Sequence, residues 1–147
     1  MRRILPPVWL VSSILVAAAL HFGLPLVRFQ SDLVRIFGAV LLLFGMFMTA
    51  SAAGAFKRAG TPVIPFETST ALVTAGWFRF TRNPMYLGMV LMLIGTGVAL
   101  GSVGALLPLP VFIAIIQTQF IRGEEQMLTG IFGQQYTDYQ ARVRRWL

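Results

Sequence analysis

Residues 85–121 read MYLGMVLMLIGTGVALGSVGALLPLPVFIAIIQTQFI, a stretch of 37 residues without one charged side chain. One helix crosses the hydrocarbon core of a bilayer with about 20 apolar residues. The stretch is therefore too long for one crossing and fits two, with a turn at Gly101 and Ser102 or near the two prolines that follow. It predicts a helical hairpin in a membrane, with crossings at residues 85–101 and 103–121.

Two further apolar runs precede this hairpin, at residues 8–27 and 36–56. The first is interrupted only by His21 and Pro25. Together with the arginines before it, this run also fits a cleaved signal peptide, but the crossings that follow favour a retained membrane helix. We therefore predict an all-α integral membrane protein, a single domain with four transmembrane helices arranged as two hairpins.

The composition excludes several classes of protein. Hydrophobic residues make up 56% and charged residues 12% of the chain, and the mean hydropathy is +0.75. Soluble domains carry about 25% charged residues, so neither a soluble enzyme nor a disordered chain fits. The chain has no cysteine and one histidine. Thiolate sites, cysteine nucleophiles and histidine-rich metal centres are therefore not expected, and we predict no metal site.

The positive charges are distributed unevenly about the predicted crossings. The net charge is +7, but cytoplasmic loops of membrane proteins are rich in Lys and Arg, so the charge does not require a nucleic-acid partner. With the N-terminus inside, ten of the twelve basic residues fall on the inner side. This predicts cytoplasmic termini and a cytoplasmic loop at residues 57–84. The inner residues are Arg2, Arg3, Lys57, Arg58, Arg79, Arg82, Arg122, Arg142, Arg144 and Arg145, and the outer ones are Arg28 and Arg35.

The last part of the chain has a different pattern. Apolar and aromatic residues recur at spacings of three and four, which places them on one helical face. We expect residues 124–145 to form an amphipathic helix on the cytoplasmic membrane surface. The residues of this face are Leu128, Phe132, Tyr136, Tyr139 and Val143.

One candidate site cluster precedes the third crossing, where the chain reads RFTRNPMY at residues 79–86. Asn83 and Pro84 are typical of the first positions of a helix, and the arginines are typical anchors on the inner side. The same arrangement also makes an anion site, because free N–H groups of a helix start would lie beside two guanidinium groups.

A second cluster, Arg122-Gly123-Glu124-Glu125, follows the fourth crossing. Two acidic residues here are either an acidic first turn of a helix or carboxylates that bind a ligand. The two ends of a hairpin lie on the same membrane side, so we expect the cationic and acidic clusters to share one cytoplasmic pocket.

Several glycines recur at helical spacing. Gly38 and Gly45, like Gly88 and Gly95, are seven residues apart, which is typical of close helix packing. Gly95 and Gly97 also allow a second interpretation, in which a ligand approaches bare backbone.

His21 is interpreted as a structural residue that bonds to a neighbouring helix or lies near the outer interface.

Residues 76–88, GWFRFTRNPMYLG, and 122–139, RGEEQMLTGIFGQQYTDY, resemble two motifs of the isoprenylcysteine carboxyl methyltransferase and phospholipid methyltransferase superfamily. The spacing of about 40 residues, spanned by a hairpin, is also similar. One departure is Asn83, which stands where many eukaryotic members have His. The short form with Asn is typical of bacteria, so the resemblance implies the bacterial inner membrane.

The resemblance implies transfer of a methyl group from S-adenosylmethionine to a lipophilic membrane acceptor. It also implies roles for individual residues. The implied cofactor-binding residues are Arg82, Asn83, Tyr86, Gly95, Gly97, Glu124 and Glu125, and the implied catalytic residues are Arg122 and Glu125.

The acceptor stays open between a carboxylate, an amine and other groups, of prenylcysteine, phospholipids or other lipophilic molecules. A carboxylate would lose its charge in the transfer, which a low-dielectric pocket favours. An amine must first lose a proton, for which Glu124 or Glu125 is the evident base. Two alternatives are a non-catalytic membrane scaffold and a small four-helix transporter. A transporter needs an acidic residue within a crossing, and every acidic residue here lies outside the predicted crossings.

Overall fold

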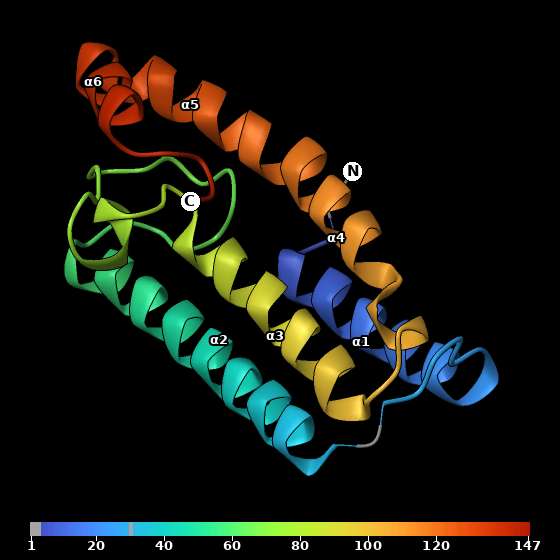
Figure 1. Ribbon diagram of the computed structural model, residues 1–147. Coiled ribbons are helices and arrows are strands. Elements are labelled where there is room, and N and C mark those ends of the chain that lie inside the picture. Colours follow the sequence, from blue (N-terminus) through green and yellow to red (C-terminus); the bar gives the residue numbers. More distant parts are fainter. Residues whose placement is uncertain (1–3, 30) are drawn as a thin grey trace.

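The computed structural model describes residues 4–29 and 31–147 (Figure 1). Arg2 and Arg3, which contribute to the inner charge count, lie outside the described residues. The described chain is helical, with one isolated bridge between Arg28 and Ser102, which confirms the all-helical prediction. The helices are α1 (Pro6–Gly23), α2 (Asp32–Arg58), α3 (Pro84–Leu100), α4 (Pro108–Ile116), α5 (Arg122–Phe132) and α6 (Gln134–Arg142), with short turns η1 (Gly76–Arg79), η2 (Gly104–Leu106) and η3 (Gln117–Ile121).

Local sequence explains where several of these helices begin and end. Proline stands in the first turn of α1, α3 and α4, where its missing N–H is no loss. Asp32 lies in the first turn of α2 and favours the positive end of the helix dipole. Helix α3 ends at Gly101 with a φ of 81°, a conformation that glycine adopts without strain.

Three helical segments are long and apolar enough to cross a membrane, namely Pro6–Gly23, Asp32–Arg58 and Gly104–Phe132. The chain is therefore described as an integral membrane protein. Helix α3 is apolar but has only 17 residues, so the fourth crossing stays a prediction. Helix α1 ends at Gly23, before the expected boundary at 27, whereas α2 extends beyond both expected ends of 36–56.

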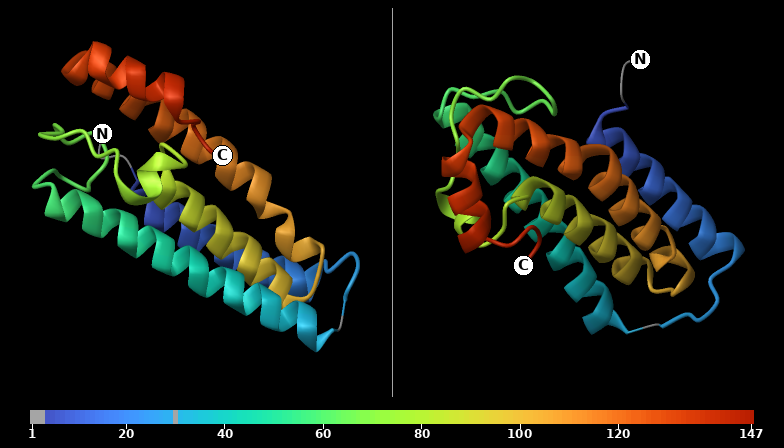
Figure 2. Two further views of the ribbon diagram at one scale, coloured as in Figure 1. Left: turned by 60° about the vertical axis from the view of Figure 1, so that its left-hand side comes forward. Right: turned by 90° about the horizontal axis from the view of Figure 1, so that it is seen from above.

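Helix α3 lies at the centre of the bundle and contacts α1, α2 and α4 (Figures 1 and 2). Its interface with α2 is built on glycines, as predicted. A Cβ atom added at Gly45 would lie 2.5 Å from the Gly88 carbonyl oxygen, and one at Gly95 would lie 2.6 Å from that of Gly38. Only bare backbone permits this approach, so the seven-residue spacing is explained by packing.

Helices α4 and α5 form one continuous rod joined by η3, a π-helical turn at Gln117–Ile121. The rod extends beyond the bundle at its α5 end (Figure 2). The expected tail helix at 124–145 is divided in the structure. Its first part belongs to α5, and α6 starts anew after Gly133, whose φ of 50° breaks the helix. Whether this part lies on a membrane surface stays a prediction.

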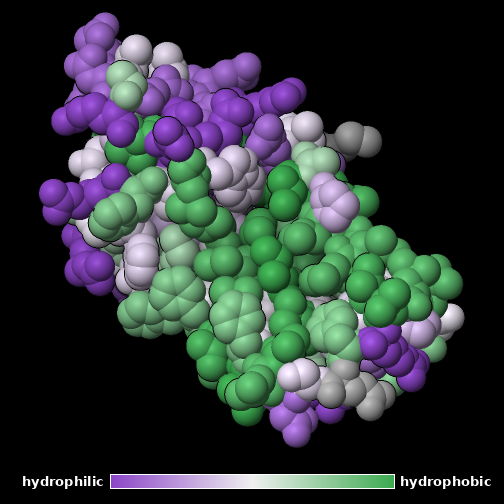
Figure 3. Space-filling model, viewed as in Figure 1, coloured by the Kyte–Doolittle hydropathy of each residue, from purple (hydrophilic) through white to green (hydrophobic). Residues whose placement is uncertain are grey.

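The two ends of the bundle differ in character. Apolar side chains cover its middle, and polar ones gather over α5, α6 and the adjoining loop (Figure 3). At the opposite end, the Nδ1 atom of His21 lies 2.9 Å from Ser102 Oγ, whose residue is fully buried. This contact joins α1 to the turn after α3, rather than to a neighbouring helix, and agrees with a structural interpretation of His21.

Candidate active site

A cavity of about 270 Å³ opens at the polar end of the bundle. Its walls come from the start of α1, the end of α2, the loop between α2 and α3, the start of α3, and helices α5 and α6. Most of its lining is apolar. The polar and charged lining residues are Glu67, Ser69, Arg82, Asn83, Tyr86, Glu124, Glu125, Tyr136 and Tyr139.

Tyr86 and Glu124 form the first polar contact in the cavity. The Tyr86 hydroxyl donates a hydrogen bond of 2.9 Å to Glu124 Oε1. Tyr86 lies in the first turn of α3 and Glu124 in the first turn of α5. The contact therefore joins the two ends of the predicted hairpin, as the sequence indicated. Within the described chain, no residue donates to Glu124 Oε2.

Glu125 makes a different set of contacts, although it is the next residue. Arg145 donates to both of its carboxylate oxygens, from Nε at 3.0 Å and from Nη2 at 2.6 Å. Arg82 Nη2 lies 3.3 Å from Glu125 Oε1. Glu125 is thus neutralised between two arginines, and its hydrogen bond raises the pKa of Arg145.

Two N–H groups of the Arg82 side chain have no acceptor among the described residues. The side chain is 11% exposed, and the two nitrogen atoms, Nε and Nη1, are buried. A buried donor without a partner costs about 1–3 kcal/mol, so such atoms require an explanation. An anionic or carbonyl group of a ligand would satisfy them.

The segment after α6 reaches the start of α3. Asn83 Nδ2 donates to the Arg145 carbonyl oxygen at 2.9 Å, and Thr81 Oγ1 donates to the same atom at 3.2 Å. Asn83 and Pro84 occupy the N-cap position and the first turn of α3, as predicted, but the Asn83 side chain makes no capping hydrogen bond to the helix. Its amide binds this later segment instead. That role needs a neutral donor and no titrating imidazole.

Helix α6 closes the site through two tyrosines. Tyr139 donates a hydrogen bond of 2.7 Å to the carbonyl oxygen of Phe78 in η1, and the Tyr136 ring packs beside it. Burial raises the pKa of both phenols. The helical periodicity predicted that both tyrosines share one face, but it gave no sign that this face belongs to the site.

Phe66 forms part of the wall from the loop. It has a φ of 66°, a strained conformation for a residue with a side chain. Its ring lies against Gly123, where an added Cβ would be 2.7 Å from the ring. The glycine before the two glutamates therefore allows the loop to approach α5.

Three residues of the predicted site lie outside this cavity. Gly95 packs against α2 and Gly97 against Leu106, nine and eleven residues beyond Tyr86, or about 14 and 17 Å along α3. Arg122 is exposed and lines a surface hollow on the other side of Glu125, which together with Arg145 also lines that hollow. The structure thus brings together Arg82, Asn83, Tyr86, Glu124 and Glu125, and it adds Arg145.

The motifs' resemblance is confirmed by comparison with known proteins. A family model described as phospholipid methyltransferase matches residues 33–135. This is more than half of the chain, so the chain belongs to the phospholipid methyltransferase family.

Individual relatives agree with this assignment. Protein-S-isoprenylcysteine O-methyltransferases A and B of Arabidopsis thaliana are 30% and 29% identical over 109 residues, which cover 73% of this chain and 55% of each relative. An uncharacterized protein of Haemophilus influenzae is 40% identical over 63 residues, which cover 43% of this chain and 100% of that protein.

The fold is similar to that of a solved structure, the eukaryotic intramembrane Ras methyltransferase isoprenylcysteine carboxyl methyltransferase. The TM-score is 0.69 at 24% identity, covering 93% of this chain and 50% of that chain. The chain thus spans about half the length of the methyltransferases that it matches.

Proposed function

We propose that this protein transfers a methyl group from S-adenosylmethionine to a lipophilic acceptor, a carboxylate or an amine, in the cavity between α3 and α5. The buried Arg82 donors carry this proposal, because two N–H groups in a largely apolar cavity have no acceptor among the residues that the structure describes. The cavity volume of about 270 Å³ is close to the lower end of the range of about 300–1,000 Å³ for ligand pockets.

The residues of the cavity fit this cofactor. Arg82 would hold its carboxylate, and the free oxygen of Glu124 would accept from its ribose hydroxyls or ammonium group. S-adenosylmethionine supplies an electrophilic methyl group on a positively charged sulfur. The protein's contribution is chiefly orientation, since methyl transfer needs positioning more than acid–base groups.

Glu124 is the residue that would hold a proton from an amine acceptor, because Glu125 is already paired with two arginines. A carboxylate acceptor would need no base, and the apolar lining would favour the loss of charge. We further propose that the cavity faces the cytoplasm, which the distribution of Lys and Arg supports, and that the membrane is the bacterial inner membrane, as the resemblance to the short form with Asn83 implies.

The test is the binding of S-adenosylmethionine and S-adenosylhomocysteine to detergent-purified protein by calorimetry. We expect micromolar affinity, equivalent to about 7 to 8 kcal/mol. The Arg82→Gln variant should lose about 10-fold or more in affinity. Arg79→Gln is the matched control, because Arg79 is a nearby exposed arginine outside the cavity lining.

Folded wild-type protein that binds neither compound would contradict the proposal and favour the scaffold. Equal affinity of Arg82→Gln and Arg79→Gln would show instead that the ligand lies away from Arg82.

A further inference from the structure

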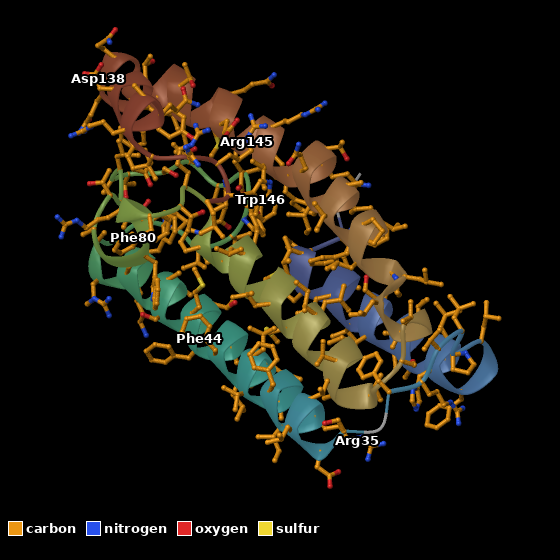
Figure 4. The ribbon with its side chains drawn as sticks, viewed as in Figure 1. Arg35, Phe44, Phe80, Asp138, Arg145 and Trp146 are labelled. Atoms are coloured by element: carbon orange, nitrogen blue, oxygen red, sulfur yellow. The ribbon has the colours of Figure 1, made fainter. Side chains whose placement is uncertain are left out.

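The segment 143–147, here called the strap, follows α6 and lies between two walls of the site. Val143 begins it in an extended conformation, with φ −123° and ψ 129°. Figure 4 shows Arg145 and Trp146 between the start of α3 and the α4–α5 rod. From the sequence, Arg145 is expected to end the tail helix and to carry one of the inner positive charges.

The strap is fixed to both walls. The Arg82 amide donates to the Arg144 carbonyl at 2.9 Å, which adds to the bonds from Thr81 and Asn83 to the Arg145 carbonyl. On the other wall, Trp146 Nε1 donates to Gln117 Oε1 at 2.9 Å. The backbone of residue 145 is thereby held in one place, and its guanidinium group is directed at Glu125.

The contact with Arg145 limits the number of hydrogen bonds that Glu125 can accept from Arg82. A carboxylate pairs best with an arginine through two parallel hydrogen bonds. Arg145 has that arrangement with Glu125, whereas Arg82 has one contact of 3.3 Å. The two remaining donors of Arg82 are buried and unpaired among the described residues. The Tyr136 hydroxyl also lies beside the Arg82 guanidinium group, but Glu125 is the carboxylate that already contacts it, so without Arg145 that carboxylate is free to pair with Arg82.

We propose that Arg145 is a positioning residue that occupies Glu125 and so keeps Arg82 available for the ligand. This inference rests on the proposed function. Arg145 acts through Glu125 and not by contact with the ligand. Its loss would allow Glu125 to turn to Arg82 and form the two-fold pair, which would compete with the ligand for the same N–H groups.

A double-substitution experiment tests the proposal, with S-adenosylhomocysteine affinity and melting temperature measured for each variant. Arg145→Gln should bind about 10-fold more weakly than wild type. Adding Glu125→Gln to Arg145→Gln should restore affinity to within about 3-fold of wild type, because a neutral amide competes poorly for Arg82. A merely structural role predicts the opposite, since a second lost contact would not repair the first.

Arg144→Gln is the matched control, because it removes the same charge from the neighbouring, exposed residue and leaves its carbonyl bond to Arg82 in place. It should bind as wild type does. Arg145→Lys serves if Arg145→Gln fails to fold; it keeps the charge, loses the two-fold pairing and should respond to Glu125→Gln in the same way.

Two results would overturn this inference alone, namely equal affinity of the Arg145 and Arg144 variants, or no recovery in the double variant. Wild-type protein without affinity would overturn the proposed function, and this inference with it.

Discussion

Glu124 and Glu125 differ in what surrounds them rather than in chemistry. Successive residues of an α-helix point about 100° apart, so Glu124 meets Tyr86 while Glu125 meets Arg82 and Arg145. One carboxylate keeps an oxygen without a donor among the described residues, and the other is fully paired. We therefore expect Glu124 to contact the ligand and Glu125 to have a structural role.

This assignment predicts opposite effects of two substitutions. Glu124→Gln should lower S-adenosylhomocysteine affinity about 10- to 150-fold, the equivalent of a charge-assisted hydrogen bond of about 1.5–3 kcal/mol, with little change in melting temperature. Glu125→Gln should chiefly lower the melting temperature, because two arginines lose their shared acceptor. Calorimetry and thermal unfolding of both variants check this. A larger affinity loss in Glu125→Gln would reverse the assignment.

Tyr139 gives a prediction for alkaline pH. Its pKa is raised by burial, whereas it is about 10 in an unfolded chain. Its contribution to stability is therefore complete below pH 10 and is lost as the pH rises further, because the unfolded chain releases the proton first. Above pH 10 the loss is up to about 1.4 kcal/mol per pH unit.

Tyr139→Phe should be less stable near pH 7, by about 1–3 kcal/mol for the unpaired Phe78 carbonyl. Its melting temperature should also fall less between pH 9 and 11 than that of wild type. Parallel curves for the two proteins over this range would argue against a titrating Tyr139.

The sequence predicted the pairing of residues 79–86 with 122–125, because a hairpin must bring its ends to one side. It did not predict Arg145, whose partners stand 20 or more residues away. Nothing in the local pattern distinguishes Arg145 from Arg144, and only the course of the strap turns one inward. Long-range contacts of this kind depend on tertiary structure.

At the scale of elements, the α2–α3 interface depends on the absence of side chains. Gly88→Ala would place its Cβ 2.7 Å from the Gly45 carbonyl oxygen, and overpacking of this kind costs about 1–3 kcal/mol. We expect a clearly lower melting temperature. Gly130→Ala is the control, because its Cβ would meet nothing within 4 Å and alanine favours a helix by about 0.5–1 kcal/mol.

An equal change in melting temperature for Gly88→Ala and Gly130→Ala would contradict this packing.

The glycine spacing was readable in the sequence because both helices repeat it at seven residues. The division of the tail was not, since the helical face continues through Gly133 in the pattern of apolar residues, and only the backbone at that residue breaks the helix.

At the scale of the whole molecule, the two ends should lie on opposite membrane sides. Arg35 lies at the end opposite Arg145 and Asp138 (Figure 4). Because the chain has no cysteine, single cysteines can report the side. In intact cells, an impermeant thiol reagent should label Ser31→Cys and Val103→Cys but not Thr68→Cys.

All three positions are exposed, whereas Ser102 is fully buried and unsuitable. Labelling of Thr68→Cys in intact cells would invert the predicted orientation. Labelling of all three after lysis is the control for reactivity.

The continuous rod of α4 and α5 makes the site sensitive to chain length as well as to residue identity. Its π-helical turn at Gln117–Ile121 accommodates one extra residue within an α-helix. Deletion of Thr118 would turn this segment into regular α-helix and leave the residues after it nearly in place, whereas deletion of a residue in the regular helix before it, such as Ile113 in α4, with the turn kept, would rotate everything after the deletion by about 100° and move it by about 1.5 Å. After this second deletion, Glu125 would stand where Glu124 now stands, with every side chain of the site still present. Insertions and deletions in the regular helix upstream of the turn can therefore silence this site without altering one of its residues.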